Sequence, residues 1–371
     1  MEYREIEKLG VKPSLLGFGC MRFPTREDKS IDEEKSQEMI DKALENGLTY
    51  IDTAYPYHEK TSEMFMGRAL SKYDRSSYLL ATKLPVWLVE DPSHVRQYFE
   101  EQCKNLKTDY IDFYLLHALN KERWNAVKKH KMIEEVEKLR DEGKIRFIGF
   151  SFHDEYPIFE DILTYRKWDF CQIQLNYIDT NIQQGMKGYE LADKLGIPVI
   201  IMEPVKGGAL AKLPKEMEDI LHAIDTEKSV ASWAFRYVAS LPNVKVVLSG
   251  MSDMAQVEDN LQTFNNFRPL NHTEMNAIEK VTQIYRSRQM NDCTGCNYCM
   301  PCPYGVNIPG NFGIWNYGSI YEDMEGAKGK YSRMDEGKRA TACQECGACE
   351  SQCPQFIPII NDLKRVVENL Q

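Results

Sequence analysis

Residues 48–58, LTYIDTAYPYH, pass from an apolar run into a polar loop. The apolar run is typical of a buried strand that ends at Asp52, and Tyr57 follows five residues later. The next strand-like run ends at Lys83, and the one after it ends at His117. Because chemistry in a parallel barrel gathers at the carboxyl ends of the strands, the sequence predicts that these four side chains converge.

The alternation of strand and helix patterns continues along the chain. Eight apolar runs, each followed by a helix-like segment, cover roughly 260 residues, which is the size of a closed (β/α)8 barrel. Several runs are almost continuously apolar, as buried parallel strands are. We therefore predict an α/β fold with a (β/α)8 TIM barrel. The alternative is an open doubly wound sheet, but no Gly-x-Gly-x-x-Gly turn follows the first strand.

Two helices are predicted at particular boundaries. After the strand that ends at His117, the pattern predicts one long helix that ends near residues 142–143. Beyond the last barrel helix, residues 265–272 resemble a linker, and Thr273 is the predicted cap of a helix that runs to about Arg288.

Composition limits the classes of function. The chain has 371 residues and a formal net charge of -10, which argues against a general nucleic-acid partner. No apolar run approaches the roughly 20 residues that span a membrane. The charged start, residues 1–5, lacks the apolar core of a signal peptide, so we expect a cytoplasmic protein with no membrane association.

The four converging side chains suit proton donation to a carbonyl oxygen. A nearby ammonium, Lys83, is expected to lower the pKa of the Tyr57 phenol, and Asp52 would keep that ammonium charged. The imidazole of His117 would orient the carbonyl. Each residue also has a structural interpretation, as a loop cap, a surface lysine, a packed ring or a core histidine. Their shared position at strand ends favours catalysis, for which a cofactor must supply the hydride.

The motifs at residues 52–57, 81–83 and 114–117 resemble the aldo-keto reductase family, and residues 17–19 and 143–151 fit as well. The resemblance covers about residues 1–270. It implies a carbonyl reductase or alcohol dehydrogenase that depends on NADPH or NADH, with Tyr57 as the general acid and a small carbonyl or alcohol as the substrate.

The resemblance also implies which residues contact the nicotinamide nucleotide. Two would bind the carboxamide, one would lie against the ring, two would lie near the pyrophosphate and four near the adenosine phosphate. In that order they are Ser151, Gln172, Met202, Gly207, Gly208, Gly250, Ser252, Gln256 and Asn260. The basic residues that grip a 2′-phosphate are replaced by Met251 and Gln256, which leaves the choice between NADH and NADPH open.

Eight of the eleven cysteines crowd into the last 80 or so residues, in two runs that each end in Cys-Pro. They are Cys293, Cys296, Cys299 and Cys302, then Cys343, Cys346, Cys349 and Cys353. Closely spaced thiols without a sign of secretion suggest metal. The second run matches the bacterial ferredoxin pattern, in which the fourth cysteine ligates the other cluster.

We therefore predict two 4Fe-4S clusters with crossed ligation. One would use the first three cysteines of the first run together with Cys353, and the other would use the last run's first three cysteines with Cys302. Two structural zinc sites are the alternative.

The whole chain resembles the ferredoxin-fused branch of the family. It would have a barrel over residues 1–284 and a small, mostly helical ferredoxin-like domain over residues 285–371. The leading hypothesis is an oxidoreductase whose clusters exchange electrons with a protein partner. A second keeps the enzyme but gives the clusters a structural or redox-sensing role. A third is a redox sensor that binds the nucleotide without turnover.

Overall fold

The computed structural model describes residues 1–295, 297–353 and 355–371. The chain forms two compact units. The first consists of Met1–Pro204 and Ala234–Leu270, and the second of Val205–Trp233 and Asn271–Gln371. Among the described residues, no helix is both long enough and apolar enough to cross a membrane.

The first unit is a closed barrel of eight parallel strands, which confirms the predicted fold. Neighbouring strands pair in chain order, and β1 closes the barrel against β8. The strands are β1 (Leu16–Gly19), β2 (Tyr50–Asp52), β3 (Leu79–Leu84), β4 (Ile111–Leu119), β5 (Ile145–Phe152), β6 (Phe170–Gln174), β7 (Val199–Met202) and β8 (Val244–Ser249).

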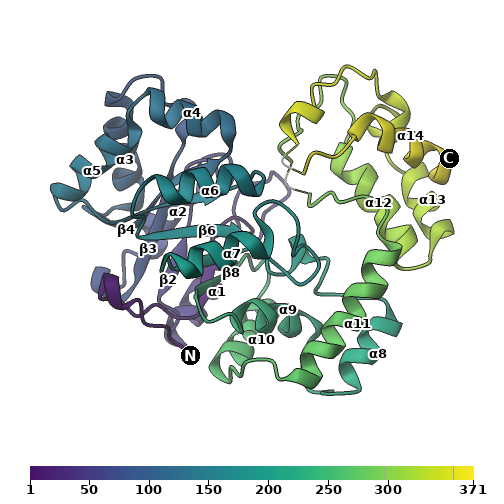
Figure 1. Cartoon of the computed structure of the whole chain (residues 1–371), viewed down its shortest axis with the longest axis horizontal. Helices are drawn as coiled ribbons and strands as arrows, with labels where there is room; N and C mark the ends of the chain where they lie inside the picture. The colour runs from purple at the N-terminus through teal and green to yellow at the C-terminus, as the bar shows by residue number, and fades with distance from the viewer. Residues whose placement is uncertain (296, 354) are drawn as a thin grey trace. The chain divides into compact units, whose positions relative to one another are not determined.

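Helices surround these strands (Figure 1). They are α1 (Glu33–Glu45), α2 (Ser62–Ala69), α3 (Ser93–Leu106), α4 (Lys121–Lys129), α5 (Met132–Asp141), α6 (Tyr156–Tyr165), α7 (Gly185–Lys194) and α10 (Met254–Asn265), while α9 (Val230–Ala239) leads into β8.

The prediction of one long helix before residue 142 is wrong. The chain breaks after α4 because Lys131 adopts a left-handed φ of 51°, which a helix cannot contain.

Aromatic rings fill the interior of the barrel. Phe113 of β4 lies with its ring centroid 5.0 Å from Tyr50, 5.0 Å from Phe147 and 4.9 Å from Phe170. Gly149 of β5 makes room for this packing, since a Cβ there would come within 2.6 Å of the Phe170 ring. The barrel is therefore a packed core, and its strand ends are the place for a site.

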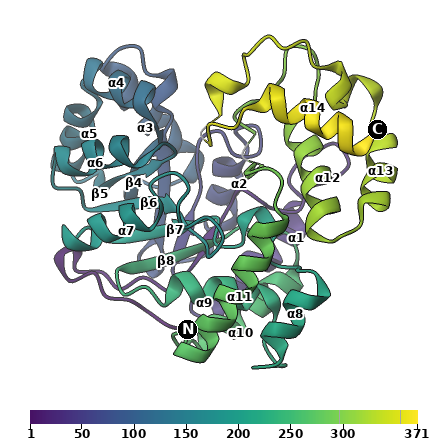
Figure 2. The ribbon, with the colours of Figure 1, turned by 45° about the vertical axis from the view of Figure 1, so that its right-hand side comes forward.

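The second unit is built from helices. They are α8 (Lys215–His222), α11 (His272–Arg288), α12 (Ile308–Ile320), α13 (Met324–Ser332) and α14 (Ile359–Leu370). Helices α12, α13 and α14 pack together around Phe312 and Trp315 (Figure 2). This arrangement confirms the prediction of a mostly helical C-terminal region.

Helix α11 starts two residues earlier than expected, because its cap is Asn271 and not Thr273. The side chain of Asn271 accepts a hydrogen bond from the Glu274 backbone at 3.0 Å, and Glu274 accepts one from the Asn271 backbone at 2.8 Å. This reciprocal capping box satisfies two backbone N–H groups, which a cap at Thr273 would leave without those partners.

A buried carboxylate near the start of β4 joins three strands. Asp112 accepts hydrogen bonds from Arg75 at 2.7 Å, from Arg146 at 2.6 Å and from the Leu80 backbone at 3.0 Å.

We expect Asp112→Asn to lower the free energy of unfolding by about 1.5–3 kcal/mol, the scale for hydrogen bonds to a charged group. The partial exposure of both arginines keeps the loss on that scale, because water can reach the unpaired guanidinium groups.

Denaturation followed by tryptophan fluorescence measures this change. Glu142→Gln is a control, because Glu142 pairs with Arg96 at an exposed site where screening by solvent weakens the pair. Equal shifts in the two variants would contradict the structural role of Asp112.

Candidate functional site

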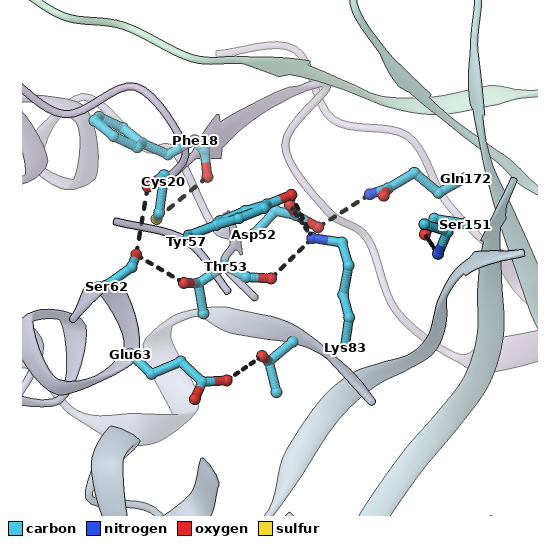
Figure 3. Close-up of polar contacts among 12 residues, drawn as sticks. Phe18, Cys20, Asp52, Thr53, Tyr57, Ser62, Glu63, Lys83, Ser151 and Gln172 are labelled. Carbon is cyan, nitrogen blue, oxygen red and sulfur yellow. Dashed lines mark hydrogen bonds and ion pairs between the residues drawn. The ribbon is translucent and has the colours of Figure 1, made fainter. Parts of the chain in front are cut away.

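Four polar side chains meet at the carboxyl ends of the first barrel strands, as the sequence predicts. Asp52 ends β2, Lys83 lies near the end of β3, His117 lies in the last third of β4, and Tyr57 lies in the loop after β2. Figure 3 shows Tyr57, Asp52 and Lys83 pointing toward one another.

The buried ammonium of Lys83 is the centre of this cluster. Its Nζ donates hydrogen bonds to Asp52 Oδ1 at 2.6 Å, to the Thr53 carbonyl at 2.8 Å and to the Tyr57 hydroxyl at 3.2 Å. These three bonds match the three N–H donors of an ammonium group. Lys83 is 1% exposed and Asp52 is 2% exposed, so the pair is satisfied without water.

The pKa values of Lys83 and Tyr57 each have opposing causes. Burial acts to lower the pKa of Lys83, but Asp52 and Tyr57 outweigh burial and raise it. Burial raises the pKa of Tyr57, and Lys83 opposes that rise without overcoming it. Lys83 lowers the pKa of Tyr57, as expected, but desolvation of the phenolate is the larger effect, so the net pKa lies above the ordinary value of a phenol. Tyr57 carries its proton at neutral pH.

His117 lies beside the phenol as a neutral imidazole. Its ring centroid is 6.1 Å from that of Tyr57 and 5.2 Å from that of Trp87. Burial, followed by the positive charges of Lys83 and Arg123, holds the pKa of His117 well below its usual value. Among the buried side-chain atoms that the structure describes, Nδ1 of His117 has no hydrogen-bond partner.

Two segments of unusual backbone hold the site. Residues His58, Glu59 and Lys60, directly after Tyr57, adopt left-handed φ values of 49°, 54° and 71°. Ala118, directly after His117, has a φ of 53°, and the pairing of β4 with β5 shifts register across it. Such conformations are uncommon outside glycine and are often found at functional sites.

A second layer of hydrogen bonds supports the loop that carries Tyr57. Thr53 and Ser62 share a hydrogen bond of 2.9 Å between their hydroxyl groups, and Ser62 donates to the Cys20 carbonyl at 3.3 Å. Glu63, the next residue of α2, accepts from Thr82 beside Lys83 at 2.6 Å. These contacts, drawn in Figure 3, tie α2 to β1, β2 and β3.

Ser151 and Gln172 lie where the carboxamide of a nicotinamide nucleotide is predicted to bind. The hydroxyl of Ser151 accepts from the Ala118 backbone at 2.7 Å and keeps its own proton for donation. The side-chain NH2 group of Gln172 donates to Asp52 Oδ2 at 3.0 Å. The carbonyl oxygen of the Gln172 side chain can therefore accept a hydrogen bond from an amide. An acceptor and a donor beside the Lys83 cluster fit a carboxamide.

The residues predicted to contact the rest of the nucleotide differ in exposure. Met202 ends β7 and is partly buried, and Gly250 follows β8 with no room for a Cβ beside Arg22. Ser252 and Gln256 are exposed at the start of α10 and bond to each other at 2.9 Å. Asn260 is buried and donates to Ser249 at 2.9 Å.

Gly207 and Gly208 belong to the second unit, where both have the positive φ that favours glycine.

Seven of the eight clustered cysteines fall into two sets within the second unit, and Cys296 lies outside the described residues. The thiols of the first set line one pocket: Cys293, Cys299 and Cys353. The thiols of the second set line another: Cys302, Cys343, Cys346 and Cys349. The last cysteine of each run thus joins the other run's set, which is the grouping that crossed ligation requires. Thiolates are the ligands that iron–sulfur clusters use, so both pockets fit such a group.

Beside His117 lie residues from two segments, 85–87 and 120–124, that the sequence suggests only as candidate pocket walls. Arg123 of α4 donates to the Ala118 carbonyl at 2.8 Å and stacks on Trp87 with 4.8 Å between guanidinium carbon and ring centroid. Burial, together with the positive charges of Arg123 and Lys83, lowers the pKa of His153 to about 4. An arginine two residues into a helix gives no sequence signal of its own, because only the bend at Ala118 brings it to the site.

Comparison with known proteins agrees with this geometry. Residues 15–283 match the Aldo/keto reductase family, and residues 292–357 match the 4Fe-4S dicluster domain. The uncharacterized oxidoreductase YqkF of Bacillus subtilis is 26% identical over 328 residues, which cover 78% of this chain and all of that protein. L-galactose dehydrogenase of Arabidopsis thaliana is 25% identical over 299 residues, which cover 73% of this chain and 90% of that protein.

A solved structure leads to the same conclusion. The holo form of aldo-keto reductase AKR11C1 from Bacillus halodurans superposes with a TM-score of 0.64 at 28% identity, covering 76% of this chain and 96% of that chain. The family match extends over most of the chain and includes every strand of the barrel. The chain is therefore an oxidoreductase of the aldo-keto reductase family that carries a C-terminal 4Fe-4S dicluster domain.

Proposed function

We propose that the barrel catalyses reduction of a carbonyl compound, or the reverse oxidation of an alcohol, with NADPH or NADH. The contact that supports this proposal most directly is the bond from Lys83 Nζ to the Tyr57 hydroxyl, with Asp52 behind the ammonium. It leaves the phenol's own O–H free to donate and puts a positive charge beside the phenolate that remains.

Proton transfer follows from the pKa directions. Tyr57 is protonated in the resting site because burial raises its pKa. As the carbonyl oxygen gains negative charge, the proton moves to it from Tyr57, and Lys83 stabilises the phenolate. Neutral His117 can donate a hydrogen bond to the same oxygen without competing as a stronger acid.

The reduced nucleotide supplies the hydride when it is bound. Ser151 and Gln172 would hold its carboxamide, and the start of α10 would face its adenosine phosphate. Asp253 caps α10 by accepting from the Gln256 backbone at 2.9 Å. A carboxylate at this position repels an additional phosphate, so this site favours NADH over NADPH.

We also propose that the two clusters transfer electrons to or from a protein partner. Cys346 is exposed, while Cys349 of the same set is buried. One cluster would therefore have an edge at the surface of the second unit, within reach of a docked partner.

Replacement of the phenol tests the role of Tyr57. We expect Tyr57→Phe to lower kcat for aldehyde reduction by about 10²–10⁴-fold, the usual contribution of a general acid. Tyr55→Phe is a matched control from the same loop, because the Tyr55 hydroxyl donates to Glu101 at 3.4 Å, away from Lys83. Steady-state assays with both nucleotides measure the change, and unchanged kcat in Tyr57→Phe would refute the assignment.

Paired serine substitutions test crossed ligation. Cys293→Ser with Cys353→Ser changes two thiols of one pocket, so anaerobically prepared protein should keep one cluster and about half of the wild-type iron. Cys293→Ser with Cys302→Ser changes one thiol of each pocket and should damage both clusters. Iron analysis and electron paramagnetic resonance of the dithionite-reduced protein measure the outcome, and the reverse result would show ligation within each run.

A further inference from the structure

The pocket that contains the first thiol set also contains polar atoms without partners. It is lined by Thr294 and Gln355 as well as by Cys293, Cys299 and Cys353. Among the buried side-chain atoms that the structure describes, Thr294 Oγ1 and both amide atoms of Gln355 have no hydrogen-bond partner. Buried polar atoms are almost always hydrogen-bonded, so these three indicate a ligand with polar atoms in this first pocket.

The two side chains can donate hydrogen bonds to sulfur. Thr294 has a hydroxyl proton, and the NH2 group of Gln355 has two more. The amide of Gln355 can turn its NH2 group toward the pocket without breaking a bond, because neither amide atom has a partner in the described part of the chain. The sulfur atoms of an iron–sulfur cluster accept hydrogen bonds, so they fit these donors.

Contacts with two helices fix the loop that carries Thr294. The side-chain oxygen of Asn291 accepts from the Cys293 backbone at 2.8 Å, and its NH2 group donates to Asp362 of α14 at 2.5 Å. Asn316 of α12 accepts from the Asn291 backbone at 3.0 Å. A donor on a fixed loop loses little freedom when its acceptor binds, which favours the hydrogen bond.

The pocket of the second thiol set differs in its polar side chains. Of the buried side-chain atoms without partners that the structure describes, none belongs to a residue that lines this second pocket. Gln344 lines it, but this side chain is exposed and donates to the Ala342 carbonyl at 3.4 Å. Unpartnered donors are therefore a property of the first pocket.

We propose that Thr294 and Gln355 donate hydrogen bonds to sulfur atoms of the cluster in the first pocket and thereby raise its reduction potential. Reduction adds negative charge to the cluster, and donors at its sulfur atoms stabilise that charge. Ile308, Phe312 and Ile359 line the same pocket and are almost fully buried, so water screens this effect little. The inference rests on the proposed placement of one cluster in each pocket.

A redox titration of the whole, anaerobically prepared protein tests the two donors, with electron paramagnetic resonance as the readout. The Cys293→Ser, Cys353→Ser variant identifies the midpoint potential of the first-pocket cluster, because that potential is the one it loses. We expect Thr294→Val and Gln355→Met each to lower this potential by about 59 mV. That shift is a tenfold change in the ratio of reduced to oxidised cluster, the scale of one hydrogen bond to a charged group. The potential of the second cluster should not move.

Two control variants separate hydrogen bonding from packing. Thr294→Ser keeps the hydroxyl and should keep the wild-type potential. Gln344→Met repeats the glutamine substitution at the second pocket, so it should leave the potential of the first-pocket cluster unchanged.

Iron analysis separates this inference from the proposed placement of the clusters. Thr294→Val and Gln355→Met proteins with full iron and the wild-type potentials overturn the inference alone. Equal shifts of both potentials also overturn it, since they indicate a general change of the second unit. If one variant loses the first-pocket cluster, the potential of the other decides. Loss of that cluster from both variants overturns the inference, because it assigns the two side chains to assembly of the pocket. A wild-type protein without iron overturns the placement of the clusters and the inference with it.

Discussion

The ion pair between Lys83 and Asp52 is the contact on which the site depends. Both side chains are almost fully buried, and burial of a charge is unfavourable unless it is paired and hydrogen-bonded. The surrounding structure supplies these bonds. The Thr53 carbonyl and the Tyr57 hydroxyl take the other two donors of Lys83, and Gln172 donates to the second oxygen of Asp52. Loss of either charge would leave the other buried without its counterion, so the pair holds β2, β3 and β6 in one arrangement.

The backbone around this pair is held in conformations that an isolated chain would avoid. Three consecutive left-handed residues follow Tyr57, and one follows His117. Each costs about 1–3 kcal/mol and persists only where its surroundings fix it. At Ala118 those surroundings are visible, because Ser151 accepts from its N–H and Arg123 donates to its carbonyl. The same bend that orients His117 therefore also positions Ser151, which is proposed to contact the carboxamide.

The second unit combines cysteines that are far apart in the chain. Its helices pack around Phe312 and Trp315, and the two thiol sets lie beside this apolar core. Ile308, the first residue of α12, lines both pockets. A cluster in either pocket would have apolar neighbours, and such surroundings tune a reduction potential by limiting solvent access.

The sequence by itself determined the barrel, the convergence of Asp52, Tyr57, Lys83 and His117, and the dicluster region. These features follow from local patterns: apolar runs of strand length, polar residues at their ends, and cysteines at short spacing. The cap of α11 was predicted wrongly and the break at Lys131 was not predicted, because competing caps and a left-handed residue are decided by contacts that a periodic pattern does not contain. Only the tertiary structure decided the net pKa direction of Tyr57, the grouping of the described cysteines and the place of Arg123. Each of these depends on burial or on contacts between distant residues, and desolvation in particular is set by what surrounds a group in space.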